Sequence, residues 1–174
     1  MNSLYVRIMV VVAATLLTLF IAALHGCTSK IDNQETYYRL NRNLDAAGVQ
    51  FYQREAEVVN LLGDGEYMPG FGGHGRDYKD KGIRVSFIDD PDGMMYGRVS
   101  SIDYYGADCS IYGIKQGDAI TEAETVLLKQ NYKKLENQGF VYKNGEYWIM
   151  LQGNQQVNAI SVDFRDERLM DRNY

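Results

Sequence analysis

The stretch GIKQGDAITEAETVLL, residues 113–128, decides how this chain is interpreted, because an earlier segment follows the same pattern. That segment is GVQFYQREAEVVNLLG, residues 48–63, and the two align without a gap. The alignment pairs Gly48 with Gly113, Val49 with Ile114, Glu57 with Glu122 and Leu62 with Leu127. In both segments a glycine and a β-branched residue precede a run whose apolar residues lie three and four positions apart, which is the spacing of an amphipathic helix.

Two further pairs of segments repeat downstream in the same order. GIRVSF (82–87) corresponds to EYWIML (146–151), and VSSIDYY (99–105) corresponds to VNAISVDF (157–164). Their alternation of apolar and polar residues is typical of half-buried strands. Each match is short, but matching pieces in a fixed order indicate an internal repeat.

A helix followed by an antiparallel meander, used twice, predicts an α+β fold. We expect two tandem units, residues 48–110 and 111–174, that form one sheet-and-helix domain. The first unit departs from the pattern, because Tyr52 and Gln53 stand where the second unit has Gly117 and Asp118. Glycine adopts a positive φ readily and tyrosine does not, so the opening turn of the first unit is expected to differ. Asp118 or Thr121 is expected to cap the second helix.

The motif "GI…GD…helix…strands" in residues 113–128 resembles a unit found in bacterial envelope lipoproteins. The predicted arrangement is similar to the fold of secreted β-lactamase inhibitor proteins and of the small outer-membrane assembly lipoproteins. This resemblance covers roughly residues 48–165. Members of these groups act by binding other proteins, so the resemblance implies a protein-binding role here too.

The N-terminus carries a second signal. Ile8 to Leu24 is an uncharged apolar run, and the residues Leu24-His25-Gly26-Cys27 that end and follow it resemble the lipobox of bacterial lipoproteins. In that family the cysteine is diacylated through its sulfur and becomes the new N-terminus, which implies a signal peptide over residues 1–26 and acylation of Cys27. Buried acyl chains hold a protein at the membrane, at roughly 0.8 kcal/mol for each CH₂. The alternative is an uncleaved anchor helix, because seventeen residues approach the length that spans a bilayer.

Residues 27–47 are interpreted as a polar tether followed by a helix from about Glu35 to Ala47. Both interpretations of the N-terminus place the domain on the extracytoplasmic side of a membrane. The formal net charge is −5, and the sequence has no cluster of basic residues that could bind phosphates. Nucleic-acid binding is therefore not expected. If Cys27 is acylated, Cys109 has no partner, and we expect it to be a small buried residue rather than a nucleophile.

The segment PGFGGHGRDY, residues 69–78, is interpreted as a glycine-rich loop. Phe71, His74 and Arg76 are its candidate binding residues, because loops often carry binding groups. The alternative is a mobile connection between strands that binds nothing.

Aromatic residues lie on the predicted strands or at their ends. As a group they are candidates for a binding surface with Tyr and Trp anchors, although ordinary sheet packing explains any single Tyr. The candidates are Tyr104, Tyr105, Tyr147 and Trp148.

Catalytic and metal chemistry has little support in the sequence. Only two His and two Cys are present, and no zinc spacing occurs. The acids Asp89, Asp90 and Asp92 do not match a calcium-binding loop, because Val99 stands where the twelfth position needs Glu. We therefore expect no cofactor, no metal and no enzymatic activity. The predicted function is a lipid-anchored, non-catalytic protein-binding module, that is, an adaptor, assembly factor or inhibitor with an envelope protein as partner. The alternative is a lipoprotein that binds a small molecule or a glycan.

Overall fold

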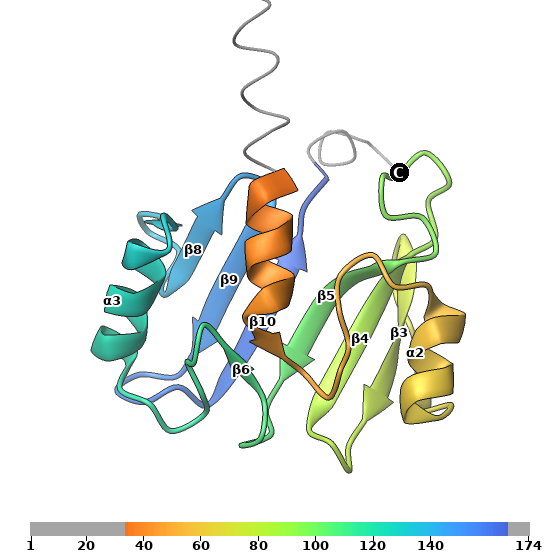
Figure 1. The fold of residues 1–174 in the computed structure, drawn as a ribbon, viewed down its shortest axis with the longest axis horizontal. Coiled ribbons are helices and arrows are strands. Elements are labelled where there is room, and N and C mark those ends of the chain that lie inside the picture. The colour runs from red at the N-terminus through yellow and green to blue at the C-terminus, as the bar shows by residue number, and fades with distance from the viewer. Residues whose placement is uncertain (1–33, 167–174) are drawn as a thin grey trace, which may run out of the picture. The chain divides into compact units, whose positions relative to one another are not determined.

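The computed structural model describes residues 34–166, and their fold is α+β, as the sequence predicts. Residues 34–42 are helical, and two further helices follow, α2 (Glu55–Leu62) and α3 (Ile120–Lys129). The helices lie against one eight-stranded antiparallel sheet (Figure 1). The expected signal peptide and Cys27 lie outside the described residues.

The order of strands in the sheet divides it into two similar parts. From edge to edge the strands are β2 (Glu66–Pro69), β3 (Gly73–Tyr78), β4 (Ile83–Ile88), β5 (Val99–Tyr104), β10 (Ala159–Phe164), β9 (Tyr147–Gln152), β8 (Val141–Asn144) and β7 (Lys133–Lys134). We call residues 44–104 the first half and residues 110–164 the second half. Each half runs from a helix into four strands, and the last strands, β5 and β10, pair at the centre of the sheet.

A small second sheet also joins the halves. It pairs β1 (Leu44–Asp45) with β6 (Ser110–Ile111), with Leu44 opposite Ile111. The helix expected to reach Ala47 therefore ends earlier, because the chain is already extended and paired at Leu44.

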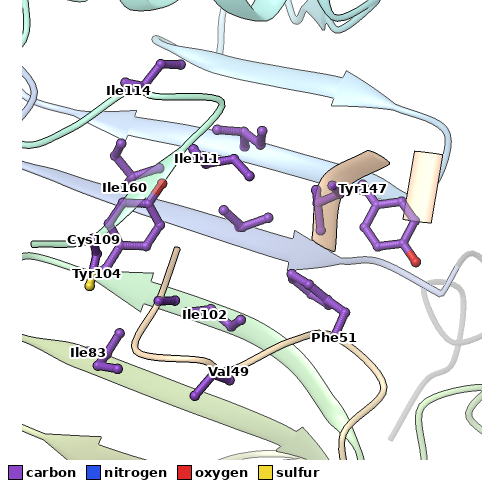
Figure 2. Close-up of a cluster of buried hydrophobic side chains, with 14 of the residues drawn as sticks. Val49, Phe51, Ile83, Ile102, Tyr104, Cys109, Ile111, Ile114, Tyr147 and Ile160 are labelled. Atoms are coloured by element: carbon purple, nitrogen blue, oxygen red, sulfur yellow. The ribbon is translucent and has the colours of Figure 1, made fainter. Parts of the chain in front are cut away.

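The core lies between the helices and one face of the sheet. In β4 every second residue, Ile83, Val85 and Phe87, is almost fully buried, as the period of two predicts. Figure 2 shows part of this core, in which side chains of both halves contribute to one continuous cluster. Cys109 lies in the same cluster, and burial raises the pKa of its thiol, so it has the character of a structural residue.

The backbone makes the same bonds in both halves. The N–H of Val99 donates to the carbonyl of Gln53 at 2.9 Å, and the N–H of Val157 donates to the carbonyl of Asp118 at 2.9 Å. The repeat pairs Gln53 with Asp118 and Val99 with Val157, so the two bonds join equivalent residues. The equivalence of the halves therefore extends to individual hydrogen bonds.

The opening turn of the first half does not differ as the sequence suggested. Tyr52 has φ 72° and Gly117 has φ 94°, so both occupy the left-handed region. Side chains hold the two turns in the same way: the N–H of Gln50 donates to Gln53 Oε1 at 2.9 Å, and the N–H of Lys115 donates to Asp118 Oδ2 at 2.8 Å. Asp118 is thus a turn residue and not the helix cap, a position that Ala119 occupies without a side-chain bond. Helix packing and these bonds outweigh the cost of a tyrosine at positive φ, about 1–2 kcal/mol.

The glycine-rich segment was expected to be a loop, and most of it is not. Residues 73–78 form β3, paired with β2 on one side and β4 on the other. The glycines are needed for close approach: a Cβ on Gly73 would lie 2.3 Å from the carbonyl oxygen of Phe87. Only the turn around Phe71 remains outside the strands.

Candidate functional site

A charged hollow lies beside the start of α2 in the first half. It has a volume of about 400 Å³ and is lined by Arg54, Glu55, His74, Asp89, Tyr96, Gly97 and Arg98. We call this site the charged corner. Helix α2, strand β3 and the connection between β4 and β5 all contribute to it, so segments far apart in the sequence build one site.

His74 is the centre of the charged corner. Its Nε2 lies 3.2 Å from Glu55 Oε2, and its Nδ1 lies 2.9 Å from Asp89 Oδ1. The ring is also stacked between two aromatic rings, with centroids 5.4 Å away for Tyr67 and 5.2 Å away for Phe87. Both ring nitrogens and both ring faces are therefore occupied, which fixes the position of the side chain.

Arg76 strengthens this network from the same strand. Its Nε donates to Glu55 Oε1 at 2.6 Å, and its Nη1 donates to the carbonyl of Asp64. Burial alone would raise the pKa of Glu55, but the hydrogen bonds from Arg76 and His74 outweigh burial and lower that pKa. Glu55 is thus a carboxylate held by two partners on β3.

The sequence places these side chains together through strand geometry. His74 and Arg76 are two residues apart in β3, so both point to the face that α2 covers. On that face they lie opposite Phe87 and Val85 of β4. A glycine-flanked histidine, interpreted from the sequence as part of a loop, is instead held on a rigid strand.

At the matching corner of the second half the positions of Glu55 and His74 carry apolar residues, and a Lys134–Glu124 ion pair lies nearby, with Lys134 Nζ 5.2 Å from the Phe140 ring centroid. Both helices begin at aligned residues, Glu55 in α2 and Ile120 in α3, and Ile120 is only 2% exposed. The position of His74, opposite Phe87, corresponds to that of Phe140, whose carbonyl accepts the N–H of Leu151 at 3.0 Å. The first half therefore carries charge at positions where the second half has apolar side chains.

The first half exposes several large apolar side chains, of which Tyr96 lines the charged corner and Tyr67 stacks on His74. Tyr67 is 58% exposed, Phe71 87%, Tyr96 57% and Met94 45%. The first two belong to β2 and the turn after it, and the last two to the connection between β4 and β5. Within the second half, as far as the structure describes it, Leu128 is the one large apolar residue with comparable exposure. These exposed side chains are the candidates for a recognition surface.

A second hollow lies on the other side of His74. It has a volume of about 310 Å³, and its lining includes Phe71, His74, Arg84, Ser86 and Ser100. Small residues at the ends of β3 and β4 leave this space open. The predicted binding residues Phe71 and His74 therefore line the same hollow, whereas Arg76 is not part of its lining.

The four aromatic candidates on the strands do not form one surface. Tyr104 and Tyr147 are each 1% exposed and belong to the core, because alternation turns them toward the helices. Trp148 points to the opposite face, where the Arg165 guanidinium lies 4.0 Å from its ring centroid. The hydroxyl of Tyr105 donates to Asp77 Oδ1 at 2.7 Å, and burial together with this bond raises the pKa of Tyr105 to about 12.

Sequence interpretation missed most of the charged corner. Arg54, Glu55, Tyr96 and Arg98 were not singled out, and Asp89 was considered only as a turn or calcium residue. One signal was present in the alignment. Glu55 falls on an apolar residue of the other segment, at a position where the helix should face the core.

Within residues 34–166, no group of three or more His, Cys, Asp and Glu side chains is arranged to hold a metal ion. The helices of this part of the chain also lack the length and apolar character needed to cross a bilayer. The apolar run at residues 8–24 lies outside the described residues, so the choice between signal peptide and anchor helix stays open.

Comparisons with known proteins give two similar structures. No family model and no curated protein matches the sequence. An extracellular protein containing an SCP domain from Bacillus anthracis matches over 67% of this chain, with 10% identity and a TM-score of 0.48. The match spans 44% of the Bacillus anthracis protein.

The second similar structure is a DUF4309 family protein (YjgB) from Bacillus subtilis, with 16% identity and a TM-score of 0.36 over 65% of this chain and 79% of that one. The chain is thus similar in structure to an extracellular Bacillus protein and to a DUF4309 protein. Neither is described as a β-lactamase inhibitor or an assembly lipoprotein.

Proposed function

We propose that this chain is a lipid-anchored extracytoplasmic lipoprotein built from two tandem units, and that it acts as a non-catalytic protein-binding module. Its role would be that of an adaptor, assembly factor or inhibitor with an envelope protein as partner. Cys27 carries the lipid, and the first half carries the binding surface. The resemblance to β-lactamase inhibitor proteins and assembly lipoproteins belongs to this proposal.

One observation supports the binding surface most directly. The first half exposes Tyr67 and Tyr96 beside a charged hollow, whereas in the second half the positions of Glu55 and His74 carry the apolar residues Ile120 and Phe140. Large aromatic anchors beside buried charged groups are the composition of binding hot spots.

The state of His74 supports a non-catalytic role. Both of its nitrogens are within hydrogen-bonding distance of carboxylates, at 3.2 Å from Glu55 and 2.9 Å from Asp89. A general base needs a nitrogen that can reach a substrate proton. An imidazole held on both sides acts as a structural link between β3, α2 and the end of β4.

The second candidate is binding of a small molecule or a glycan. The hollow of about 310 Å³ beside Phe71 favours it, because Arg84 and two serines could hydrogen-bond a polar ligand there. Loss of ligand binding on changing Phe71, with protein capture unaffected, would favour this candidate.

Site-specific photo-crosslinking in cells tests the proposed binding surface. A photoreactive amino acid replaces Tyr96 in one strain and Leu128 in another, since both side chains are exposed and apolar but lie in different halves. We expect a dominant protein adduct from position 96 and none from position 128. Equal adducts at both positions, or none at either, would contradict the proposal.

The anchor has its own test. Changing Cys27 to Ala should abolish lipid attachment, and the mature protein should then leave the membrane fraction or keep its signal peptide. Mass spectrometry of the purified chain checks this outcome. An unchanged mass together with unchanged membrane retention would favour the uncleaved anchor helix.

A further inference from the structure

Two arginines face each other across the charged corner. Arg54, just before α2, and Arg98, just before β5, form an antiparallel bridge. Residues directly opposite each other in such a bridge project to the same side, and like charges placed there destabilise the pair. Both side chains line the hollow of about 400 Å³.

The nearby acids already have partners. Glu55 is bound by Arg76 and His74, and Asp89 lies against His74. Arg98 donates one Nη1 hydrogen bond to the carbonyl of Tyr52 at 2.8 Å, which positions its guanidinium group without neutralising it. Glu55 and Asp89, the carboxylates that line the hollow, are therefore bonded to Arg76 and His74, and Arg54 and Arg98 line the same hollow.

The second half has no such charge at the same bridge. There Ala119 pairs with Gln156, so the equivalent positions are neutral. The backbone contacts of the bridge are thus compatible with uncharged side chains. The paired arginines are a feature of the first half alone, as are the exposed aromatic residues next to them.

The other residues that line the hollow are suited to a segment of a partner protein rather than to a buried ion. Tyr96, which is 57% exposed, provides an aromatic wall. Gly97 has φ 62°, and a Cβ placed there would meet nothing within 4 Å, so the hollow is open above the backbone. An extended segment could enter with its charged group between the arginines and its apolar part on Tyr96.

We propose that the charged corner binds an acidic side chain of the partner protein, with an Asp or Glu carboxylate between Arg54 and Arg98 and the neighbouring residues on Tyr96. This inference rests on the proposed protein-binding function and specifies the chemistry of the partner. Arginine suits this task because its planar fork of donors matches a carboxylate.

The test uses the full chain in micelles of a neutral detergent and a blocked pentaglutamate peptide as probe. Nuclear magnetic resonance follows the Gly97 amide and the Nε–H groups of Arg54 and Arg98. We expect these signals to shift with pentaglutamate, to stay unchanged with pentaglutamine, and to respond less as the salt concentration rises.

Two double variants separate this site from general electrostatics. Arg54→Ala with Arg98→Gln installs the neutral residues of the second half, and about tenfold weaker binding is expected. Lys129→Ala with Lys133→Gln removes two exposed charges of the same sign from the second half, and binding should change less than about twofold. Circular dichroism should match the parent chain for both variants, which checks that each is folded.

Several results would overturn the inference. These are no shift with pentaglutamate, equal weakening in both double variants, or phosphate binding as tightly as the peptide. Photo-crosslinking distinguishes the two proposals. If position 96 still captures the partner in the Arg54/Arg98 variant, the proposed function stands and the inference fails. If the peptide binds but position 96 captures no protein, the corner binds carboxylates, but the proposed function fails and the acidic partner protein fails with it.

Discussion

The first and second halves share a backbone and differ in the chemistry of one corner. Helix α2 begins at Glu55, which binds Arg76 and His74, whereas α3 begins at Ile120, which is buried. The hydrogen bonds that hold the opening turns are the same in both halves. Scaffold and site can thus be separated by comparing equivalent positions within one chain.

The halves also differ in the link between their last two strands. In the first half this link runs from Asp89 to Arg98 and exposes Met94 and Tyr96. In the second half it is shorter and begins with Gly153, where a Cβ would lie 1.9 Å from the carbonyl oxygen of Gln156. The shorter link turns tightly at Gly153, and the longer one exposes two large apolar side chains.

Exchanging the residues at the helix starts should give the largest effect. Ile120→Glu places a carboxylate in a buried apolar corner without a partner, and we expect a loss of about 3–5 kcal/mol in the free energy of unfolding. Glu55→Ile should lower the free energy of unfolding far less, because residue 55 is partly exposed and the new side chain places no charge in the core. Urea denaturation measures both variants, and similar losses would show that the two corners do not differ as described.

The links between the last strands should differ next. Gly153→Ala is expected to destabilise the domain by about 2–3 kcal/mol, because its backbone has φ 136° and the added carbon meets the Gln156 carbonyl. Asp89→Ala, at the first residue after β4, should be milder and should act through His74. Thermal unfolding of the two variants checks this order.

The opening turns should show a smaller difference. Gly117→Ala introduces a side chain at φ 94° with nothing within 4 Å of the new carbon, so only backbone strain is added. The expected loss is about 1 kcal/mol. Gly139→Ala, at φ 69° and also in open space, is the matched control and should cost a similar amount. A much larger loss in the free energy of unfolding at Gly117 would mean that the substitution disrupts contacts of the turn in addition to straining its backbone.

Acid should weaken the first half through Glu55, with the smallest effect. Since its pKa is lowered in the folded state, the ion pairs of Glu55 stabilise the domain above its ordinary pKa and are lost as the pH falls through the folded value. In Glu55→Gln, the difference between the free energies of unfolding at pH 7 and pH 3 should be smaller than in the parent chain. An equal difference in the two chains would show that the ion pairs of Glu55 do not stabilise the domain.

Much of the fold could be predicted from the sequence, because the internal repeat supports each helix and strand that the local patterns indicate. The alignment placed both helices, and period-two alternation placed Val85 and Phe87 on the buried face. Strand β3 was missed because Gly73 and Gly75 have no side chains to alternate and are typical of loops. Their presence in a strand depends on close contact with β4, which is tertiary information.

The candidate site was less accessible to sequence analysis. His74 and Arg76 were identified from a conspicuous segment, but their partners lie on other elements that only the folded sheet brings together. Tyr104 and Tyr147 were grouped with exposed aromatics because the phase of each strand, which decides the buried face, depends on its neighbours. The repeat itself contained the missing signal, since Glu55 aligns with Ile120.

Photo-crosslinking at one exposed apolar position in each half tests the central claim most directly, namely that the first half carries the binding surface. The account predicts a dominant protein adduct from a photoreactive residue at position 96, and its loss when Phe71 and Tyr67 are changed to Ala. A probe at position 128 should give only background. The same adduct from position 128, or an adduct at position 96 unaffected by the loss of Phe71 and Tyr67, would contradict it.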